Sequence, residues 1–283
     1  MSTISELIRQ RFGLRESEEL SRDAASDDVL NTTIEDLLNR RSIRRYTDEP
    51  IDNEVLDTLL ACAQSAPTKS NLQQYSIIVV SDASLRQRLA EHCPKTPQLT
   101  TCPVFLVFCA DTRRNQRVAK FRNHNYANNN LDGFVNAVID AAMAMQCLIT
   151  AAESMGLGCA AISEIRDRIE QVSALLELPP GVFPIAGLTL GKPAAPGFIN
   201  QRLAPHVVIH QDRYDDSDLE TDTETYDARR HAIYPIPDEA QMHTDKYGTA
   251  DDYRWSENTA RQLSLPERSN LRAFLTAQGF DLD

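Results

Sequence analysis

Residues 40–46 read RRSIRRY and concentrate positive charge in an otherwise acidic chain. If this stretch runs extended, alternate side chains share a face, so that Ser42, Arg44 and Tyr46 lie together. A hydroxyl beside a guanidinium suits a phosphate oxyanion, because arginine offers a forked pair of donors. A solvated basic turn would have the same composition, so these residues alone leave both interpretations open.

A second polar group precedes an apolar run. Asn71, Gln73 and Tyr75 come directly before residues 76–80, SIIVV, which predict a buried strand. Loops at the end of a sheet often read ligands. Asparagine and glutamine each offer a donor and an acceptor, a pattern that matches the edge of a heterocycle.

Two other groups fail as chemical sites. His206 and His210 have HxxxH spacing, but residues 206–210 predict a short edge strand, on which the two rings would lie about 13 Å apart, too far to share a metal ion. Cys159 has no basic or histidine partner near it in sequence, so we expect a buried structural thiol. The six cysteines show no CxxC pairing and indicate thiols rather than disulfides. We therefore predict no metal site and no catalytic nucleophile.

The elements that position these residues centre on residues 134–154, which are apolar around almost the whole helix. Such a helix is buried in a large core or crosses a membrane. Asp140 would be costly in a bilayer, so we predict a core helix that continues into a subunit interface, with Ala141 and Ala144 there. Further buried strands are predicted at 103–111 and 184–190.

The remaining segments carry less information. Residues 112–131 are basic and then asparagine-rich, which suggests a lid or a mobile crossing. Residues 212–227 are acidic and predict a solvated crossing, 226–233 predict a helix, and the chain from Trp255 onward predicts two amphipathic helices.

Composition narrows the function classes. The chain has 283 residues and a net charge of −12, which argues against nucleic acid or an anionic membrane as a partner. The amphipathic N-terminal segment has no apolar signal core, so we expect a cytoplasmic protein.

Four segments taken together, in this order and spacing, resemble the flavin-dependent nitroreductase family, in particular its NADPH nitroreductase and flavin reductase branch. They are RRSIRRYTDEPI, APTKSNLQQYSIIVV, GLGCAAISEIRDRIEQVSALLELP and VFPIAGLTLGKP. The resemblance implies an α+β fold: a three-layer α/β/α sandwich with a central mixed, mainly antiparallel sheet, in an intertwined homodimer. It divides the chain into an N-terminal helix and polar connector (1–33), an FMN-binding core (34–211), and an acidic crossing with a C-terminal helical extension over the partner subunit (212–283).

The same resemblance assigns cofactor-binding residues. Those matching the segments that hold the FMN phosphate and ribityl chain are Arg40, Arg41, Ser42, Arg44, Asn200 and Arg202. Those matching the segments at the flavin ring are Asn71, Gln73, Tyr75, Ser163 and Glu164. Two positions depart from the family pattern. Glu164 replaces a usual glycine, so its carboxylate is expected over the pocket, where it would narrow the substrate range. Asn200 replaces a usual lysine, which removes one positive charge from the phosphate site.

The resemblance implies an FMN oxidoreductase that takes electrons from NAD(P)H and passes them to nitroaromatics, quinones or flavins. Alternatives are an ene-reductase or dehydrogenase with a dedicated substrate, which Glu164 favours, and a non-catalytic flavin-binding redox sensor. Lys246 and Arg254, in the loop before Trp255-Ser256, are the expected readers of the 2′-phosphate of NADPH. The alternative is that both cations only neutralise neighbouring aspartates.

Overall fold

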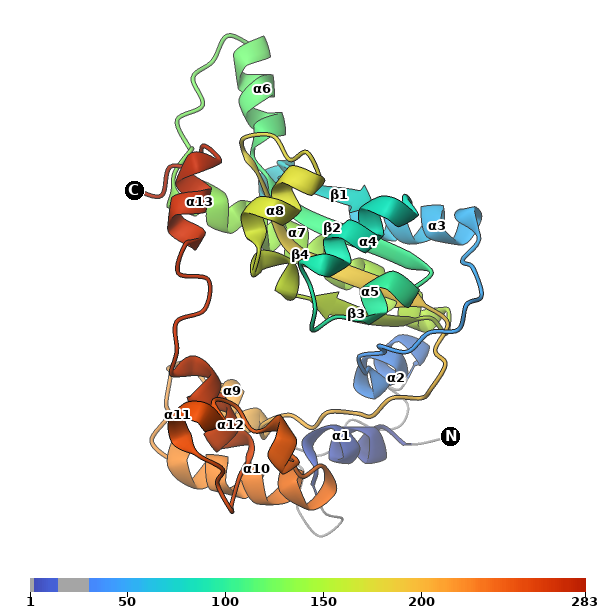
Figure 1. The fold of residues 1–283 in the computed structure, drawn as a ribbon, viewed down its shortest axis with the longest axis vertical. Coiled ribbons are helices and arrows are strands. Elements are labelled where there is room, and N and C mark those ends of the chain that lie inside the picture. The colour runs from blue at the N-terminus through green and yellow to red at the C-terminus, as the bar shows by residue number, and fades with distance from the viewer. Residues whose placement is uncertain (1–2, 15–30) are drawn as a thin grey trace. The chain divides into compact units, whose positions relative to one another are not determined.

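The computed structural model describes residues 3–14 and 31–283 (Figure 1). The chain forms two compact units. Unit 1 comprises Met1–Asn39 and Ile199–Glu267, and unit 2 comprises Arg40–Phe198 and Arg268–Asp283.

Unit 2 is built on a four-stranded sheet in the order β1-β2-β4-β3, whose strand pairs are all antiparallel. The strands are β1 (Tyr75–Val79), β2 (Val104–Asp111), β3 (Gly158–Ile162) and β4 (Val182–Gly191). The expectation of a mixed sheet is therefore wrong for the described strands. Parallel pairing occurs at an isolated bridge between Ser42, which lies outside these strands, and Cys159 of β3. Pro184 lies in the interior of β4, and the register shifts beside it, which suits a residue without an N–H.

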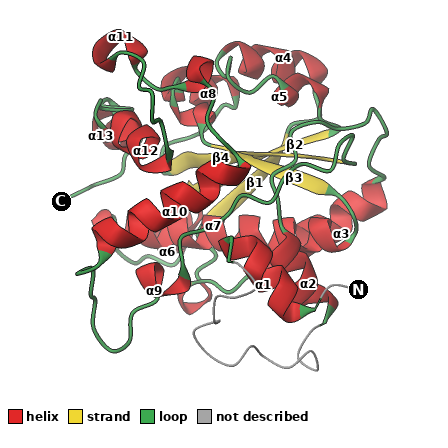
Figure 2. Cartoon of the chain, turned by 90° about the horizontal axis from the view of Figure 1, so that it is seen from below, coloured by secondary structure: helices red, strands yellow, loops and turns green. Residues whose placement is uncertain are grey.

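Helices cover both faces of this sheet (Figure 2). All eight residues of β2 are buried, and alternate ones face opposite sides. Leu106 and Phe108 pack with α3 (Asn53–Gln64), α7 (Leu131–Ser154) and α13 (Leu271–Ala277). Phe105 and Val107 pack with α4 (Ala83–Glu91), α5 (Gln98–Thr101) and α8 (Ile169–Leu175). The predicted three-layer α+β sandwich is thus confirmed. The other helical elements of unit 2 are η2 (Lys69–Asn71), α6 (Arg113–Phe121) and η3 (Glu164–Arg166).

Helix α7 is the long apolar helix that the sequence predicted. Length and composition alone would allow it to cross a membrane, but its buried face packs against β2 and α3. Its surface is not uniformly covered: Ala141 and Ala144 are fully buried, whereas a row on another face is exposed. The expectation that Ala141 and Ala144 lie at a subunit interface is wrong, because both face the core of their own chain.

Unit 1 is helical in its described part. Its elements are α1 (Ile4–Phe12), α2 (Thr32–Asn39), α9 (Pro205–Val208), α10 (Leu219–Ile233), η4 (Asp238–Ala240), α11 (Thr244–Tyr247) and α12 (Trp255–Leu263). The predicted strand at 206–210 is wrong: Pro205 opens the short helix α9, since its fixed φ suits the first helical position. Helix α10 begins earlier than predicted, within the acidic segment, and its buried residues are Tyr226 and Asp227.

Candidate functional site

The arginine-rich segment 40–46 runs along the edge of β3. The backbone N–H of Ile43 donates to Cys159 O over 3.0 Å, and Ile43 itself is buried. Gly158 makes this approach possible, since a Cβ there would lie 2.6 Å from the Ile43 side chain. The anchored backbone leaves Arg44 exposed, and its side chain has no hydrogen bond or ion pair to any described residue.

The predicted common face of Ser42, Arg44 and Tyr46 does not form. The Tyr46 hydroxyl donates to Ile43 O at 2.5 Å and lies 2.8 Å from Thr189 Oγ1. Burial raises the pKa of Tyr46 above its ordinary value. Tyr46 therefore turns inward while Arg44 points to solvent, because regular strand pairing is limited to single bridges at residues 42 and 46.

The first arginines of the segment differ in their surroundings. Arg40 Nε lies 3.6 Å from Glu153 Oε1, near the C-terminal end of α7. Arg41 is half-buried. The Arg40 contact ties the start of the segment to α7, so part of its charge is already balanced inside the protein.

The loop before β1 has an unusual backbone. Ser70, Asn71 and Gln73 have φ of 49°, 58° and 51°, in the left-handed region that residues other than glycine adopt at a cost. Asn71 and Gln73 are exposed, and Gln73 Nε2 donates to Asn71 Oδ1 over 3.3 Å. Strain of this kind persists only where surrounding contacts hold it.

Asp140 of α7 supplies those contacts from the core side. It is 1% exposed, and its two carboxylate oxygens accept the backbone N–H groups of Lys69 and Gln74, each over 3.0 Å. These two residues bracket the strained positions. From the sequence, Asp140 was recognised only as a residue that disfavours a membrane span. The available signal was a single acid in an apolar helix, since such an acid needs buried partners.

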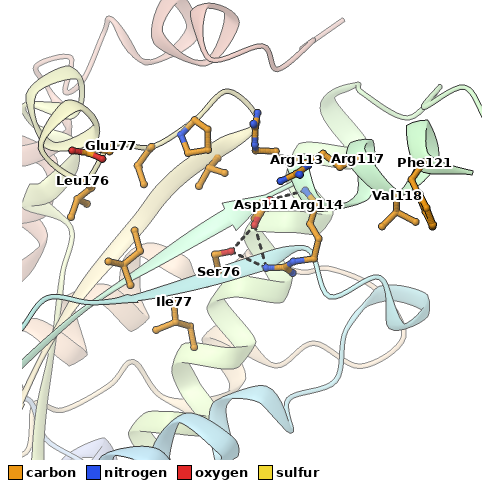
Figure 3. Close-up of a pocket in the computed structure, with 14 residues that line it drawn as sticks. Ser76, Ile77, Asp111, Arg113, Arg114, Arg117, Val118, Phe121, Leu176 and Glu177 are labelled. Atoms are coloured by element: carbon orange, nitrogen blue, oxygen red, sulfur yellow. Dashed lines mark hydrogen bonds and ion pairs between the residues drawn. The ribbon is translucent and has the colours of Figure 1, made fainter.

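Arg114 of α6 holds the same loop from the other side. It donates from Nη1 to Gln73 O over 2.7 Å and from Nη2 to Tyr75 O over 3.0 Å. It also contacts Ser76 and Asp111 (Figure 3). Tyr75 itself is buried in the cluster shared with α7, where burial raises its pKa, whereas Gln73 points outward.

Ser163 and Glu164 follow the end of β3. Ser163 is exposed, and Glu164 is buried. The Glu164 carboxylate accepts the backbone N–H of Lys95 over 2.8 Å and the hydroxyl of Thr96 over 2.6 Å. Both oxygens are thus bonded to the α4–α5 connection.

The cysteines near these loops are structural. Burial, with a smaller contribution from the Glu164 carboxylate, raises the pKa of Cys93 to about 12. Burial likewise raises the pKa of Cys159 to about 12. The expectation that Cys159 is a buried thiol is confirmed.

Asn200 and Arg202 belong to unit 1. The carbonyl of Asn200 accepts from Arg11 Nη1 at 3.2 Å and from Arg202 Nη1 at 3.1 Å. A pocket of about 410 Å³ lies beside them, with Tyr226 and Trp255 in its wall in an edge-to-face contact at 5.1 Å. In unit 1, His206 bonds Asp222 at 2.9 Å, and the His210 ring lies against Tyr214.

Arg254 and Lys246, the two cations expected to bind a 2′-phosphate, both contact other side chains. Arg254 Nε lies 2.5 Å from Asp252 Oδ1, and Lys246 Nζ lies 4.8 Å from the centre of the Tyr247 ring. Sequence reasoning missed Arg261 of α12, which is buried and donates to Gly248 O over 2.7 Å. Arg261 therefore fixes the C-terminal end of α11, the short helix that carries Lys246.

Comparison with known proteins covers nearly the whole chain. Residues 37–192 match the Nitroreductase family, and residues 200–283 match the Nitroreductase family, C-terminal domain. The chain is 34% identical over 256 residues to an FMN reductase (NADPH) of Bacillus subtilis, covering 89% of this chain and 99% of that protein. It is 35% identical over 251 residues to the oxygen-insensitive NADPH nitroreductase of Salmonella typhimurium, covering 89% and 99%.

A solved structure gives the same result. The NADPH:FMN oxidoreductase from Vibrio harveyi, complexed with NAD+, has a TM-score of 0.77 at 30% identity and covers 88% of this chain and 98% of its own.

Proposed function

The chain belongs to the nitroreductase family, and we propose that it is an NAD(P)H-dependent FMN oxidoreductase. The observation that carries this proposal is the match to FMN reductases and NADPH nitroreductases over almost their full lengths. FMN, when bound, supplies the electron-transfer chemistry, so the protein contributes position and electrostatics rather than a nucleophile.

We assign the FMN phosphate and ribityl chain to Arg40, Arg41, Ser42, Arg44, Asn200 and Arg202. The guanidinium of Arg44 supports this assignment, because it is exposed on an anchored backbone and makes no hydrogen bond or ion pair with the described residues. A phosphate with nearly two negative charges needs such cations in a chain of net charge −12. Arg40 contributes less, because it also lies beside Glu153.

We assign the flavin ring to Asn71, Gln73, Tyr75, Ser163 and Glu164. Gln73 and Asn71 present amides from a loop whose backbone is held at both ends by Asp140. Tyr75 shapes the core behind the loop rather than offering a polar edge. Glu164 acts by fixing the turn after β3, since its carboxylate bonds residues 95 and 96.

We propose a homodimer whose interface includes the exposed face of α7. Four large apolar side chains on that face are between 38% and 48% exposed in the single chain: Leu131, Val135, Ile139 and Met143. An apolar row of this kind marks an interaction surface. We further propose that residues 212–283 extend over the partner subunit and that the protein acts in the cytoplasm.

Nitroaromatics, quinones and free flavins are the proposed electron acceptors. The feature that favoured a dedicated ene-reductase or dehydrogenase substrate was Glu164, in place of a usual glycine, with its carboxylate expected over the pocket. Because both of its oxygens are bonded within the chain, we favour a broad acceptor range.

The test is an absorption spectrum of the purified protein before and after anaerobic addition of NADPH. We expect a flavin spectrum that bleaches on addition of NADPH and returns when a nitroaromatic or quinone is added. A bound flavin that NADPH fails to reduce would favour the redox-sensor alternative. Protein that binds no FMN, even after reconstitution, would refute the proposed function.

A further inference from the structure

Unit 2 contains a pocket of about 750 Å³ between α6, β1 and the segment that follows α8 (Figure 3). This volume is within the range of small-molecule sites. Its lining includes none of the residues assigned to FMN.

The floor of the pocket is a closed polar network. Ser76 Oγ donates to Asp111 Oδ2 over 2.5 Å, and Arg114 Nη2 donates to Ser76 Oγ over 2.9 Å. Arg114 also lies 3.3 Å from Asp111 Oδ2. Arg114 also donates from Nη1 to Gln73 O and from Nη2 to Tyr75 O, so both of its terminal nitrogens are bonded within the protein.

Two further arginines of α6 line the same pocket with fewer partners. Arg113 and Arg117 are four residues apart, which places them on neighbouring turns of one helix face. Arg113 makes one long bond, 3.4 Å to Pro180 O. The Arg117 side chain is exposed and has no hydrogen bond or ion pair to the part of the chain that the structure describes.

The charge of the lining is close to plus one. Three arginines, 113, 114 and 117, stand against two acids, Asp111 and Glu177, and 3 − 2 = 1. A net positive pocket in a chain of net charge −12 suits a monoanion.

Apolar side chains lie next to these arginines. Val118 and Phe121 of α6 are 53% and 73% exposed, and both line the pocket. Leu176 lines the opposite side of the pocket in Figure 3. A ligand that covers these apolar side chains removes them from water, which lowers the free energy of the complex.

We propose that this pocket binds a small monocarboxylate with an apolar body. The carboxylate pairs with Arg117 and Arg113, since the forked guanidinium matches its two oxygens. The apolar body covers Val118 and Phe121, which lie on the same helix as the two arginines. The site is separate from the FMN residues, so it does not depend on the proposed function.

The test is isothermal titration calorimetry of the full-length protein, as purified, with 4-phenylbutyrate. The neutral 4-phenylbutyramide and inorganic phosphate serve as comparison ligands. For a ligand of this size we expect a dissociation constant of about 1 mM or below. The amide and phosphate should each bind at least about tenfold more weakly, because one lacks the charge and the other lacks the apolar body. The proposal would be overturned if the amide bound with the same dissociation constant as the carboxylate, or if the carboxylate gave no binding heat at the highest concentration tested.

Variants locate the site. Arg117→Glu and Phe121→Ser should each weaken binding of 4-phenylbutyrate by at least about tenfold, and circular dichroism should show an unchanged fold because both side chains are exposed. Lys120→Glu makes the same charge change on α6 outside the pocket lining and should leave binding within about twofold. Binding that survives both pocket variants, or falls equally in Lys120→Glu, would show that the carboxylate binds elsewhere.

Discussion

The carboxylate of Asp140 accepts the backbone N–H of Gln74 over 3.0 Å, across 66 residues of sequence. Its other oxygen accepts the N–H of Lys69 over the same distance. A buried acid of the central helix therefore closes the loop that carries Asn71 and Gln73 in a strained backbone conformation.

Asp140→Asn should weaken FMN binding. The amide keeps one acceptor oxygen but turns an NH₂ group toward the second backbone donor, which leaves a buried N–H unsatisfied at a cost of about 1–3 kcal/mol. We expect FMN affinity to fall about tenfold and the urea midpoint to drop, measured by flavin fluorescence and denaturation. Asp132→Asn, which removes an exposed acid from the same helix, is the control. Unchanged FMN affinity in Asp140→Asn would show that the loop does not contact the flavin.

Arg44→Ala and Arg202→Ala should give folded protein that purifies largely without flavin. Each lost charge-assisted bond is worth about 1.5–3 kcal/mol, or roughly 10- to 150-fold in affinity. Arg45→Ala removes the exposed arginine next to Arg44 and should keep its flavin. Flavin-to-protein absorbance ratios after gel filtration measure the effect, and full flavin in both variants would refute the phosphate assignment.

Ile139→Asp and Met143→Asp should give monomers that lose flavin. Both side chains belong to the exposed row of α7, so a carboxylate there would be buried without a partner in a dimer. Val118→Asp, an equally exposed apolar position on α6, should remain dimeric. Sedimentation velocity at micromolar concentration reports the oligomeric state. A flavin-loaded monomer of the wild type would contradict the proposed interface.

NADPH should be preferred over NADH by no more than about tenfold in kcat/KM, a gap of about 1.4 kcal/mol. An exposed pair between a cation and the 2′-phosphate contributes little after screening, and Arg254 is already paired with Asp252. Lys246→Ala and Arg254→Ala should narrow the gap without changing the NADH rate, and Asp252→Asn should widen it by releasing Arg254. If none of the three variants alters the ratio, these cations only neutralise local acids.

Stability should fall above pH 9. Burial raises the pKa of Cys93, Cys109 and Cys159 to about 12 each, so the folded state keeps protons that the unfolded chain loses above the ordinary thiol pKa of 9.0. The stabilisation by the neutral thiols is complete below pH 9 and is lost as pH rises toward 12, by up to about 1.4 kcal/mol per pH unit for each thiol. Urea midpoints at pH 7.5 and 10.5 measure the change. A Cys93→Ala variant should lose less stability between these two pH values than the wild type, and an equal loss would contradict the role of this thiol.

The sequence alone located the main strands and the central helix, because they are long, strongly apolar runs whose type depends on local pattern. The layered α+β arrangement of these elements followed from the resemblance of four segments to a known family. The sequence also located the arginine segment and the amide loop, since their residue types stand out from the surrounding composition. It failed where local signals were weak or misleading. Residues 206–210 have strand-like residues, but Pro205 starts a helix there.

Only the tertiary structure decided how these pieces are held. The partners of Asp140 and Glu164 lie 66 to 71 residues away in sequence, and no periodicity reports such a pairing. The inward turn of Tyr46 depends on Thr189 of β4, and the exposed side of α7 depends on which faces the sheet and α3 already cover. Burial of each side chain is set by neighbours distant in sequence, so it could be read only once those neighbours were in place.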